Sequence, residues 1–249
     1  MGAASTMPVS AMDQHTPESP RARGLQMARS MCWHCQSAVT GEYFCERCVK
    51  VQPVSKETDY FTCLGVPRRL MLDPKKLEAK FYELSRTFHP DFYQTKSSAE
   101  QTISLGNAAV LNTAYRTLRD PIQRAEYLLG LEAGSVKNIR TSPPADLFEE
   151  ILELQDTLEE YRSSERDSQE GRELRAALET EQRALEQRQK EMEAQLQRLF
   201  TEWDQLQDRG EATSQARAER DRLLKQMRDL LSNRTYISSI VNDLAATIT

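Results

Sequence analysis

The sequence predicts an all-α fold, because long segments repeat apolar residues at helical spacing and few residues break helices. The 249 residues include nine glycines and ten prolines, and 39% are apolar and 29% charged. This balance is typical of a soluble protein built from amphipathic helices. We predict three folded parts in chain order: a small N-terminal zinc knuckle module, a helical hairpin, and a C-terminal antiparallel three-helix bundle with long helices.

The overall charge and hydropathy exclude several classes of partner. A net charge of −5 and a pI of about 5.5 argue against nucleic acid. No apolar run approaches the roughly 18 residues of a membrane span, and no signal-peptide core is visible, so we expect a soluble protein with no membrane partner. Residues 1–30 lack a periodic apolar face and are expected to form a disordered tail. The predicted location is cytoplasmic, with the mitochondrial matrix as the alternative because of the arginines in this tail.

Four of the five cysteines form two C-x2-C pairs within residues 31–50: Cys32, Cys35, Cys45 and Cys48. Each pair places two thiolates on one tight turn, and two such turns complete a tetrahedral four-sulfur site. Such a closed site is typical of structural Zn²⁺, which we predict as the cofactor, although iron stays an alternative. Two pairs at this spacing make a redox dithiol a poor interpretation.

Residues 58–131 predict a hairpin of two antiparallel helices. Asp73-Pro74 begins the first helix, which ends at His89-Pro90, and the second runs from about residue 99 to 118. We expect Leu105, Ala108 and Leu111 to lie in the apolar row of the second helix. Residues 132–144 are expected to form a linker.

Residues 145–249 predict the bundle. Apolar residues recur every seven positions at Leu178, Leu185, Met192, Leu199 and Leu206. Breaks near residues 163–171 and 208–211 divide the region into three helices, and such short connections make neighbours antiparallel. Phe148 and Leu152 form a second apolar stripe on the first helix, and Tyr236 and Ile240 do so on the last. These stripes either widen the core or form an exposed patch for a partner.

Five segments resemble the HscB family, the specialised J-domain co-chaperones of iron–sulfur cluster biogenesis. They are Asp59-Tyr-Phe-x-x-Leu-Gly65, His89-Pro-Asp91, Leu111-Asn-x-Ala-Tyr115, Thr117-Leu118 and Pro121-x-x-Arg124-Ala-x-Tyr-Leu-Leu129. The tetracysteine module resembles the metal-binding forms of this family. The C-terminal helices depart from the family pattern, because they are longer and richer in Arg, Gln and Glu.

The resemblance implies a co-chaperone and not an enzyme. The hairpin would be a J domain that binds a DnaK/HscA-type chaperone and stimulates its ATPase through His89, Pro90, Asp91, Lys76, Lys80 and Arg86. The bundle would bind the iron–sulfur scaffold protein IscU through Phe148, Leu152 and Tyr236. The three histidines lie in the tail, a metal knuckle and the hairpin loop, and none has a nucleophile or paired carboxylate beside it.

Other interpretations stay open. A general J-domain co-chaperone would serve unfolded clients, and a zinc-containing helical adaptor would bind a protein without activating a chaperone. The scaffold-binding residues could equally be core residues. Self-association through the long helices is a further alternative.

Overall fold

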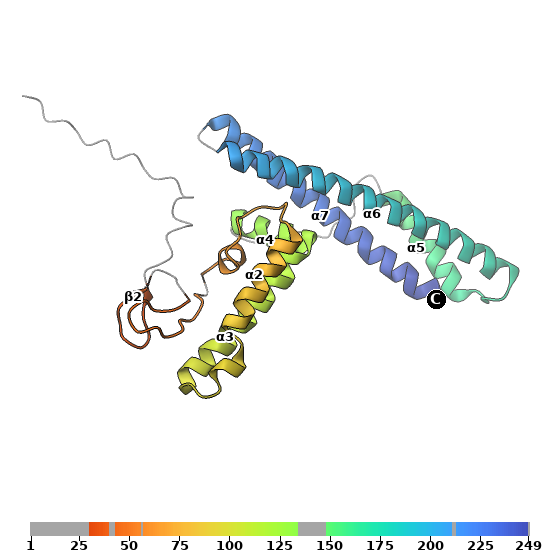
Figure 1. Ribbon diagram of the computed structural model, residues 1–249. Helices are drawn as coiled ribbons and strands as arrows, with labels where there is room; N and C mark the ends of the chain where they lie inside the picture. Colours follow the sequence, from red (N-terminus) through yellow and green to blue (C-terminus); the bar gives the residue numbers. More distant parts are fainter. Residues whose placement is uncertain (1–29, 40–42, 56, 134–147, 211–212, 249) are drawn as a thin grey trace, which may run out of the picture. The chain divides into compact units, whose positions relative to one another are not determined.

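The structure, a computed structural model, describes residues 30–39, 43–55, 57–133, 148–210 and 213–248. The predicted all-α class is confirmed, apart from two short strands beside the cysteines (Figure 1). The predicted tail apart from Ser30, which belongs to a strand, and most of the predicted linker lie outside the described residues. Among the described helices, none combines the length and apolar character needed to cross a bilayer.

The chain forms two compact units. The smaller unit combines Met1–Thr58 with Pro90–Asn107, and the larger combines Asp59–His89 with Ala108–Thr249. The cysteine pairs therefore share a unit with the segment that follows His89. The larger unit holds the rest of the hairpin and the bundle.

Two short strands and a 3-10 helix accompany the cysteines in the smaller unit. Strands β1 (Ser30–Met31) and β2 (Ala38–Val39) are antiparallel. The 3-10 helix η2 (Pro90–Tyr93) precedes helix α3 (Ser98–Arg119). The side chain of Tyr93 is buried, so this connection is anchored in the unit.

Aspartates cap three of the four α-helices between residues 58 and 133, and the helix start predicted at Asp73-Pro74 is confirmed. Asp59 caps α1 (Tyr60–Cys63) by accepting hydrogen bonds from the next N–H groups. Asp73 does the same for α2 (Pro74–Thr87), with proline as its first residue. Asp120 caps α4 (Pro121–Ala133), accepting from the N–H groups two and three residues on at 2.8 and 2.9 Å. Helix α4 extends two residues beyond the segment 58–131.

Helix α3 buries one stripe of side chains along its whole length. The stripe follows the helical repeat and contains Glu100, Ser104, Asn107, Leu111, Ala114 and Leu118. Its polar half lies in the smaller unit and its apolar half in the larger unit. The expectation that Leu105 belongs to the apolar row is wrong, because its side chain is 58% exposed. Burial there favours Asn107, since Gln52 and Val54 offer it hydrogen-bonding partners, described below.

The three-helix bundle consists of α5 (Phe148–Ser163), α6 (Gln169–Arg209) and α7 (Ser214–Ile248). The predicted breaks coincide with the two turns. All five residues of the predicted seven-residue repeat on α6 are buried, which confirms that seam. On α7, Leu223, Met227, Ile237, Leu244 and Ile248 are buried as well.

The end of α6 holds the chain that connects α1 to α2. The carboxylate of Asp204 is buried and accepts hydrogen bonds from the backbone N–H groups of Leu70 and Met71 at 2.9 and 2.8 Å. Burial raises the pKa of Asp204, although these two bonds oppose the shift. Arg69 also pairs with Asp208 on the surface. Polar contacts thus fix the base of the hairpin on the bundle.

Candidate functional site

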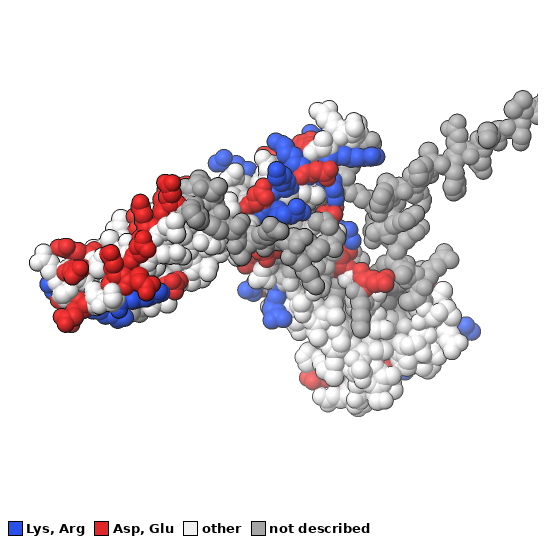
Figure 2. Space-filling view, turned by 180° about the vertical axis from the view of Figure 1, so that it is seen from behind, with Lys and Arg blue, Asp and Glu red and all other residues white. Residues whose placement is uncertain are grey.

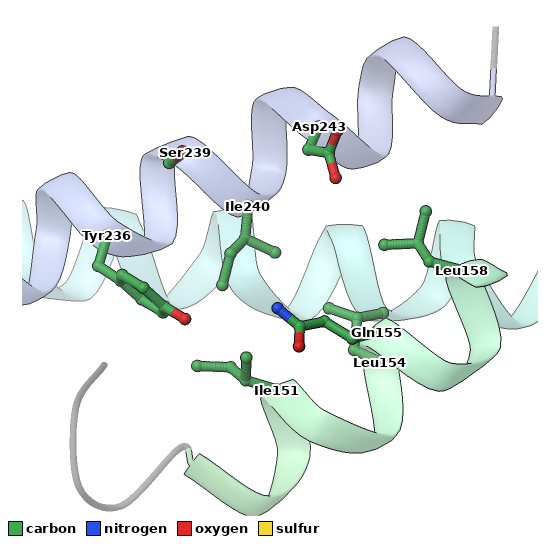
Figure 3. A pocket seen from close by; sticks show the side chains of 8 residues that line it. All are labelled: Ile151, Leu154, Gln155, Leu158, Tyr236, Ser239, Ile240 and Asp243. Atoms are coloured by element: carbon green, nitrogen blue, oxygen red, sulfur yellow. The ribbon is translucent and has the colours of Figure 1, made fainter. Parts of the chain in front are cut away.

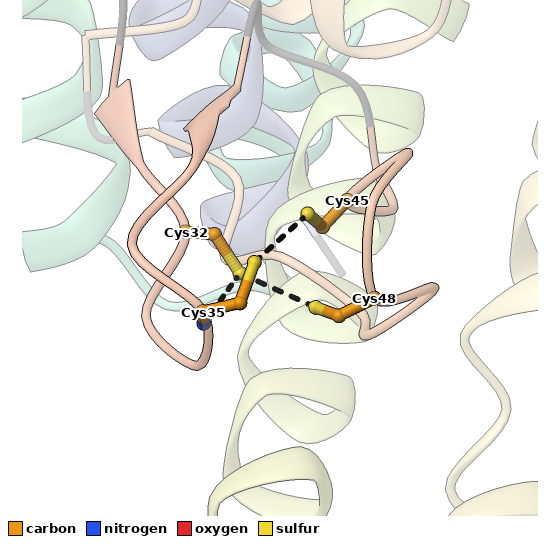
Figure 4. A group of neighbouring side chains, drawn as sticks. All are labelled: Cys32, Cys35, Cys45 and Cys48. Atoms are coloured by element: carbon orange, nitrogen blue, oxygen red, sulfur yellow. Dashed lines mark hydrogen bonds between the residues drawn. The ribbon is translucent and has the colours of Figure 1, made fainter.

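The four cysteines of the two C-x2-C pairs meet in space, as the sequence predicts (Figure 4). Their four sulfur atoms all lie within 4.8 Å of one another. The Sγ atoms of Cys32 and Cys48 are 3.6 Å apart, as are those of Cys35 and Cys45. Around a zinc ion with bonds of about 2.3 Å, tetrahedral sulfurs would lie roughly 3.8 Å apart. The geometry therefore fits a four-coordinate metal with no open position.

The two pairs have the same backbone conformation. The N–H of Cys32 donates to the carbonyl of Ser37 at 2.8 Å, and the N–H of Cys45 donates to the carbonyl of Lys50 at 2.9 Å. The fifth residue of each knuckle, Gln36 or Val49, has a positive φ of 56° or 58°. Each turn is thus closed by a residue in the left-handed region, which aims both cysteines of the pair at one point.

Hydrogen bonds lower the pKa of two of these thiols, those of Cys32 and Cys45. The hydroxyl of Ser37, whose Oγ lies 3.2 Å from Sγ of Cys45, lowers the pKa of that thiol to about 6. Burial opposes deprotonation of Cys32, but backbone N–H groups of Cys35 and His34 bring its pKa below the usual value. Burial raises the pKa of Cys48 to about 12. Four adjacent thiolates repel one another, so the complete site requires a cation.

Residues 50–54, which follow the second knuckle, contact the polar stripe of α3. Lys50 Nζ donates to Oε1 and Oε2 of Glu100 at 3.0 and 3.1 Å. The side chain of Asn107 accepts from the N–H of Val54 and donates to the carbonyl of Gln52, both at 2.9 Å. Neither Glu100 nor Asn107 was predicted as a site residue from the sequence. A signal was available, because both continue the helical spacing of the apolar row toward the start of α3.

The predicted chaperone-binding residues lie on α2 and directly after it. Lys76, Lys80 and Arg86 are all exposed on α2. The helix carries four basic and two acidic residues, and one acid, Glu83, pairs with Lys80 at 2.8 Å. His89 is exposed after the helix end, and Pro90 begins η2. Asp91 is exposed and accepts a hydrogen bond from Gln94 Nε2 at 3.2 Å.

The predicted scaffold-binding residues lie on α5 and α7 of the bundle. Leu152 is 46% exposed on α5, whereas Tyr236 is half-buried against the bundle core. Phe148 begins α5, but its side chain lies outside the described residues. Tyr236 lines a groove of about 340 Å³ between the two helices. Figure 3 shows Tyr236 and Ile240 pointing from α7 toward α5.

The outer face of α5 is strongly acidic. Six acidic side chains on this helix are exposed: Glu149, Glu150, Glu153, Asp156, Glu159 and Glu160. Only one basic residue, Arg162, belongs to α5. Figure 2 shows acidic side chains gathered over the α5 end of the bundle. Leu152 is therefore an exposed apolar side chain within an anionic surface.

Comparison with known proteins identifies the hairpin as a DnaJ domain and shows that the chain is similar to HscB co-chaperones. A family profile described as the DnaJ domain matches residues 59–127. The mouse protein named iron-sulfur cluster co-chaperone protein HscB is 30% identical over 179 residues, 70% of this chain and 71% of that protein. Co-chaperone protein HscB of Proteus mirabilis is 36% identical over 107 residues, 43% of this chain and 62% of that protein.

Solved structures share the fold. The crystal structure of human co-chaperone protein HscB has a TM-score of 0.62 at 23% identity, covering 87% of this chain and 98% of that one. Chaperone HscB from Vibrio cholerae has a TM-score of 0.51 at 26% identity, covering 76% of this chain and 96% of that one. The architecture of a hairpin followed by a bundle is therefore shared with these proteins.

Proposed function

The chain belongs to the HscB family of iron–sulfur cluster co-chaperones, and from this premise we propose that it stimulates the ATPase of a DnaK/HscA-type chaperone and delivers the scaffold protein IscU to it. A J domain implies an Hsp70-type partner. On this proposal the chain catalyses no reaction of its own, since the hydrolysis takes place on the chaperone. The named relatives are likewise co-chaperones.

The proposed interaction with the chaperone is supported by the His89-Pro90-Asp91 stretch, which comes directly after a helix with an exposed basic face. Lys76 and Lys80 are one helical turn apart and both exposed. A cationic face of this kind attracts an anionic partner surface and speeds encounter. Proline fixes the backbone between the imidazole and the carboxylate, so both reach the partner in one conformation.

Substitution of His89 tests this interaction. We expect His89→Gln to abolish stimulation of a DnaK-type ATPase while circular dichroism shows unchanged helicity, because His89 is exposed and supports no core. Full stimulation by this variant would refute the assignment. Lys76→Gln with Lys80→Gln should slow association about tenfold at low salt. The control is Lys190→Gln, an exposed lysine on α6, which should bind as the wild type does.

Three features support binding of the scaffold protein: the exposed Leu152, the groove lined by Tyr236 and the acidic face of α5. They are complementary to a partner whose surface has an apolar centre and a basic rim. Interfaces commonly combine a few buried apolar anchors with a polar rim. Changing Phe148, Leu152 and Tyr236 together to Ala should weaken IscU binding about tenfold or more in calorimetry. The control is Leu105→Ala, a more exposed leucine on α3. If the triple variant and the wild type bind IscU with equal affinity, these three residues do not form the binding site.

We propose Zn²⁺ as the metal of the tetracysteine site, with iron as the competitor. Four soft thiolates in a closed site suit zinc, which brings no redox chemistry. Elemental analysis of the purified protein decides between the two metals. The five cysteines form no disulfide with one another, which also fits a reducing compartment. The cytoplasm therefore stays the predicted location, with the mitochondrial matrix as the alternative, and fractionation of cells tests both.

Two other functions give different outcomes in the same assays. A general J-domain co-chaperone would stimulate the ATPase but bind extended apolar peptides in preference to folded IscU. A zinc-containing adaptor would bind a partner without stimulating any ATPase. Sedimentation of the purified protein tests self-association of the long helices.

A further inference from the structure

Glu100 is a buried carboxylate at the start of α3 with two sets of partners. Its Oε2 atom accepts from the N–H and the hydroxyl of Ser97 at 3.2 and 2.8 Å, while Ser97 Oγ accepts from the N–H of Glu100. This reciprocal pair is a capping box that fixes the first turn. Lys50, from the metal module, supplies the positive charge that a buried carboxylate requires. The capping box of α3 therefore depends on a residue two positions after a cysteine of the metal site.

Asn107 is a second contact two helical turns further on. Its side-chain amide is buried and bonds to both the carbonyl of Gln52 and the N–H of Val54. Each bond is made to backbone, so it requires the chain at residues 52–54 to keep one conformation. Replacing Asn107 would leave the half-buried N–H of Val54 and the buried carbonyl of Gln52 without these partners.

The same few residues are tied to the metal-site cysteines. The carbonyl of Lys50 accepts the N–H of Cys45, which closes the second knuckle. The amide of Gln52 lies 3.4 Å from the sulfur of Cys32 and also donates to the carbonyl of Lys50 at 2.8 Å. When bound, the metal would hold the four thiolates together and stabilise both knuckles. Residues 50–54 come directly after the second knuckle in the chain, so their position depends on it.

Hydrogen bonds continue from α3 to the loop that precedes it. Gln101 Nε2 donates to the carbonyls of Gln94 and Lys96, both at 3.0 Å. Gln94 Nε2 in turn donates to Oδ1 of Asp91. A continuous set of contacts within the smaller unit thus runs from the cysteines to the carboxylate of the His-Pro-Asp stretch.

We propose that a metal bound at the tetracysteine site keeps residues 90–107 in an ordered conformation. This order in turn keeps the His-Pro-Asp loop in a conformation that can bind the chaperone. Glu100 and Asn107 are the positioning residues in this coupling. The link to the chaperone rests on the function proposed above, whereas the ordering of residues 90–107 does not. The two sites are joined by named contacts whose removal is measurable.

The polarity of the contact suits reversible release. Glu100, Ser104 and Asn107 can return to water at little cost, because water replaces their hydrogen bonds. An apolar stripe such as Leu111, Ala114 and Leu118 could not separate without exposing hydrocarbon.

Hydrogen exchange on the full chain tests the ordering. The protein is compared when loaded with Zn²⁺ and after removal of zinc by a chelator. We expect exchange of the amides in residues 94–107 to rise about tenfold or more without metal, because they lose their brace. Amides of residues 108–119, on the same helix but in the larger unit, should stay within about twofold. Unchanged exchange in residues 94–107 overturns the proposal.

Two variants remove the contacts between residues 50–54 and α3 while the metal stays bound. Asn107→Ala and Lys50→Met should raise exchange in residues 94–107 with zinc still bound. Loading with Co²⁺ and recording its thiolate absorption establishes that the site is filled. The matched control is Asn112→Ala, an exposed asparagine on the same helix, which should leave exchange unchanged. Equal exchange in Asn107→Ala and Asn112→Ala overturns the positioning role.

Stimulation of a DnaK-type ATPase then tests the coupling. Zinc-loaded Asn107→Ala should stimulate about fivefold less than zinc-loaded wild type at subsaturating concentration. Raised exchange with undiminished stimulation overturns the link to the chaperone. If the loaded wild type itself gives no stimulation, the proposed function fails, and the exchange data alone decide whether the brace exists.

Discussion

Helix α3 passes through both compact units, and its buried stripe is polar in one and apolar in the other. In the smaller unit, Glu100 and Asn107 bond to residues that follow the metal knuckles. In the larger unit, Leu111 and Leu118 belong to a core with large side chains such as Phe61. One helix therefore experiences two different sources of stability.

The difference follows from how much apolar surface each region can bury. Among the described residues, the apolar cluster around the cysteines contains only Val39 besides the sulfur-bearing side chains. The bundle buries Phe200, Trp203 and rows of leucine on α6 and α7. Segments of a few tens of residues cannot stabilise a fold by apolar burial alone and need a metal or disulfides. We therefore expect the fold around the cysteines to depend on a bound metal, whereas the larger unit has an apolar core of its own.

The largest expected effect comes from removing a metal ligand. Cys45→Ser should abolish tight zinc binding and unfold the cysteine knuckles, because metal binding supplies their folding free energy, on the order of 10 kcal/mol. The thermal transition of the bundle should be unchanged. Calorimetric melting with elemental analysis checks both statements. Loss of helicity in α6 and α7 would contradict the comparison.

The next effect concerns the polar contact that the larger unit itself contains. Asp204→Ala should lower the free energy of unfolding by about 2–4 kcal/mol, because the N–H groups of Leu70 and Met71 lose their acceptor. Urea denaturation measures the change. Asp208→Ala, which breaks only an exposed ion pair with Arg69, is the control and should cost less than about 1 kcal/mol. Equal costs would show that buried polar contacts matter no more than surface ones here.

A smaller effect depends on pH. Burial disfavours the charged form of Asp59, but hydrogen bonds from Arg68 and Thr62 outweigh it and lower its pKa below 3.8. Because the pKa is lower in the folded protein than in the unfolded chain, the ionised carboxylate stabilises the fold at pH values above the unfolded-state pKa. This contribution is lost as the pH falls through the folded-state pKa. Asp59→Asn should cost about 1–2 kcal/mol at pH 7. Urea denaturation from pH 7 to pH 2 should show the difference vanish; a constant difference would contradict the role of the charge.

The smallest effect is a gain in the metal module. Val49 is β-branched, 75% exposed, and held at a φ of 58°. Val49→Asn should stabilise the zinc-loaded module by about 1 kcal/mol, since asparagine tolerates this region. Zinc affinity measured by competition with a chelator reports the gain. Gln36→Asn, at the equivalent position of the first knuckle, should gain less because glutamine is not β-branched. A loss of affinity for Val49→Asn would contradict the strain.

Local patterns in the sequence were sufficient for much of the fold. The Asp73-Pro74 start of α2 and the seven-residue repeat on α6 were predicted and are confirmed. The meeting of four sulfurs was predicted from the spacing of the cysteines and is confirmed as well. These features succeed because a cap, a repeat or a knuckle is determined by residues close together in the chain.

Other features could not be read from local patterns. Leu105 was assigned to the buried row, yet Ser104 and Asn107 are buried in its place. The choice depends on residues 50–54, about fifty positions away, which hydrogen-bond to that face of α3. The roles of Phe148, Leu152 and Tyr236 stay predictions, because exposure alone does not identify a partner.

The fold class, the family, the cluster of four cysteines and the position of the His-Pro-Asp stretch could all be predicted from the chain, since short-range spacing encodes each of them. The folded structure was needed to show that the cysteine knuckles share a compact unit with the start of α3, and that Asp204 holds the base of the hairpin. Both depend on contacts between residues remote in the chain. Pairing of buried polar groups across such distances depends on which surfaces meet, and helical spacing marks the buried face of α3 without identifying its partner.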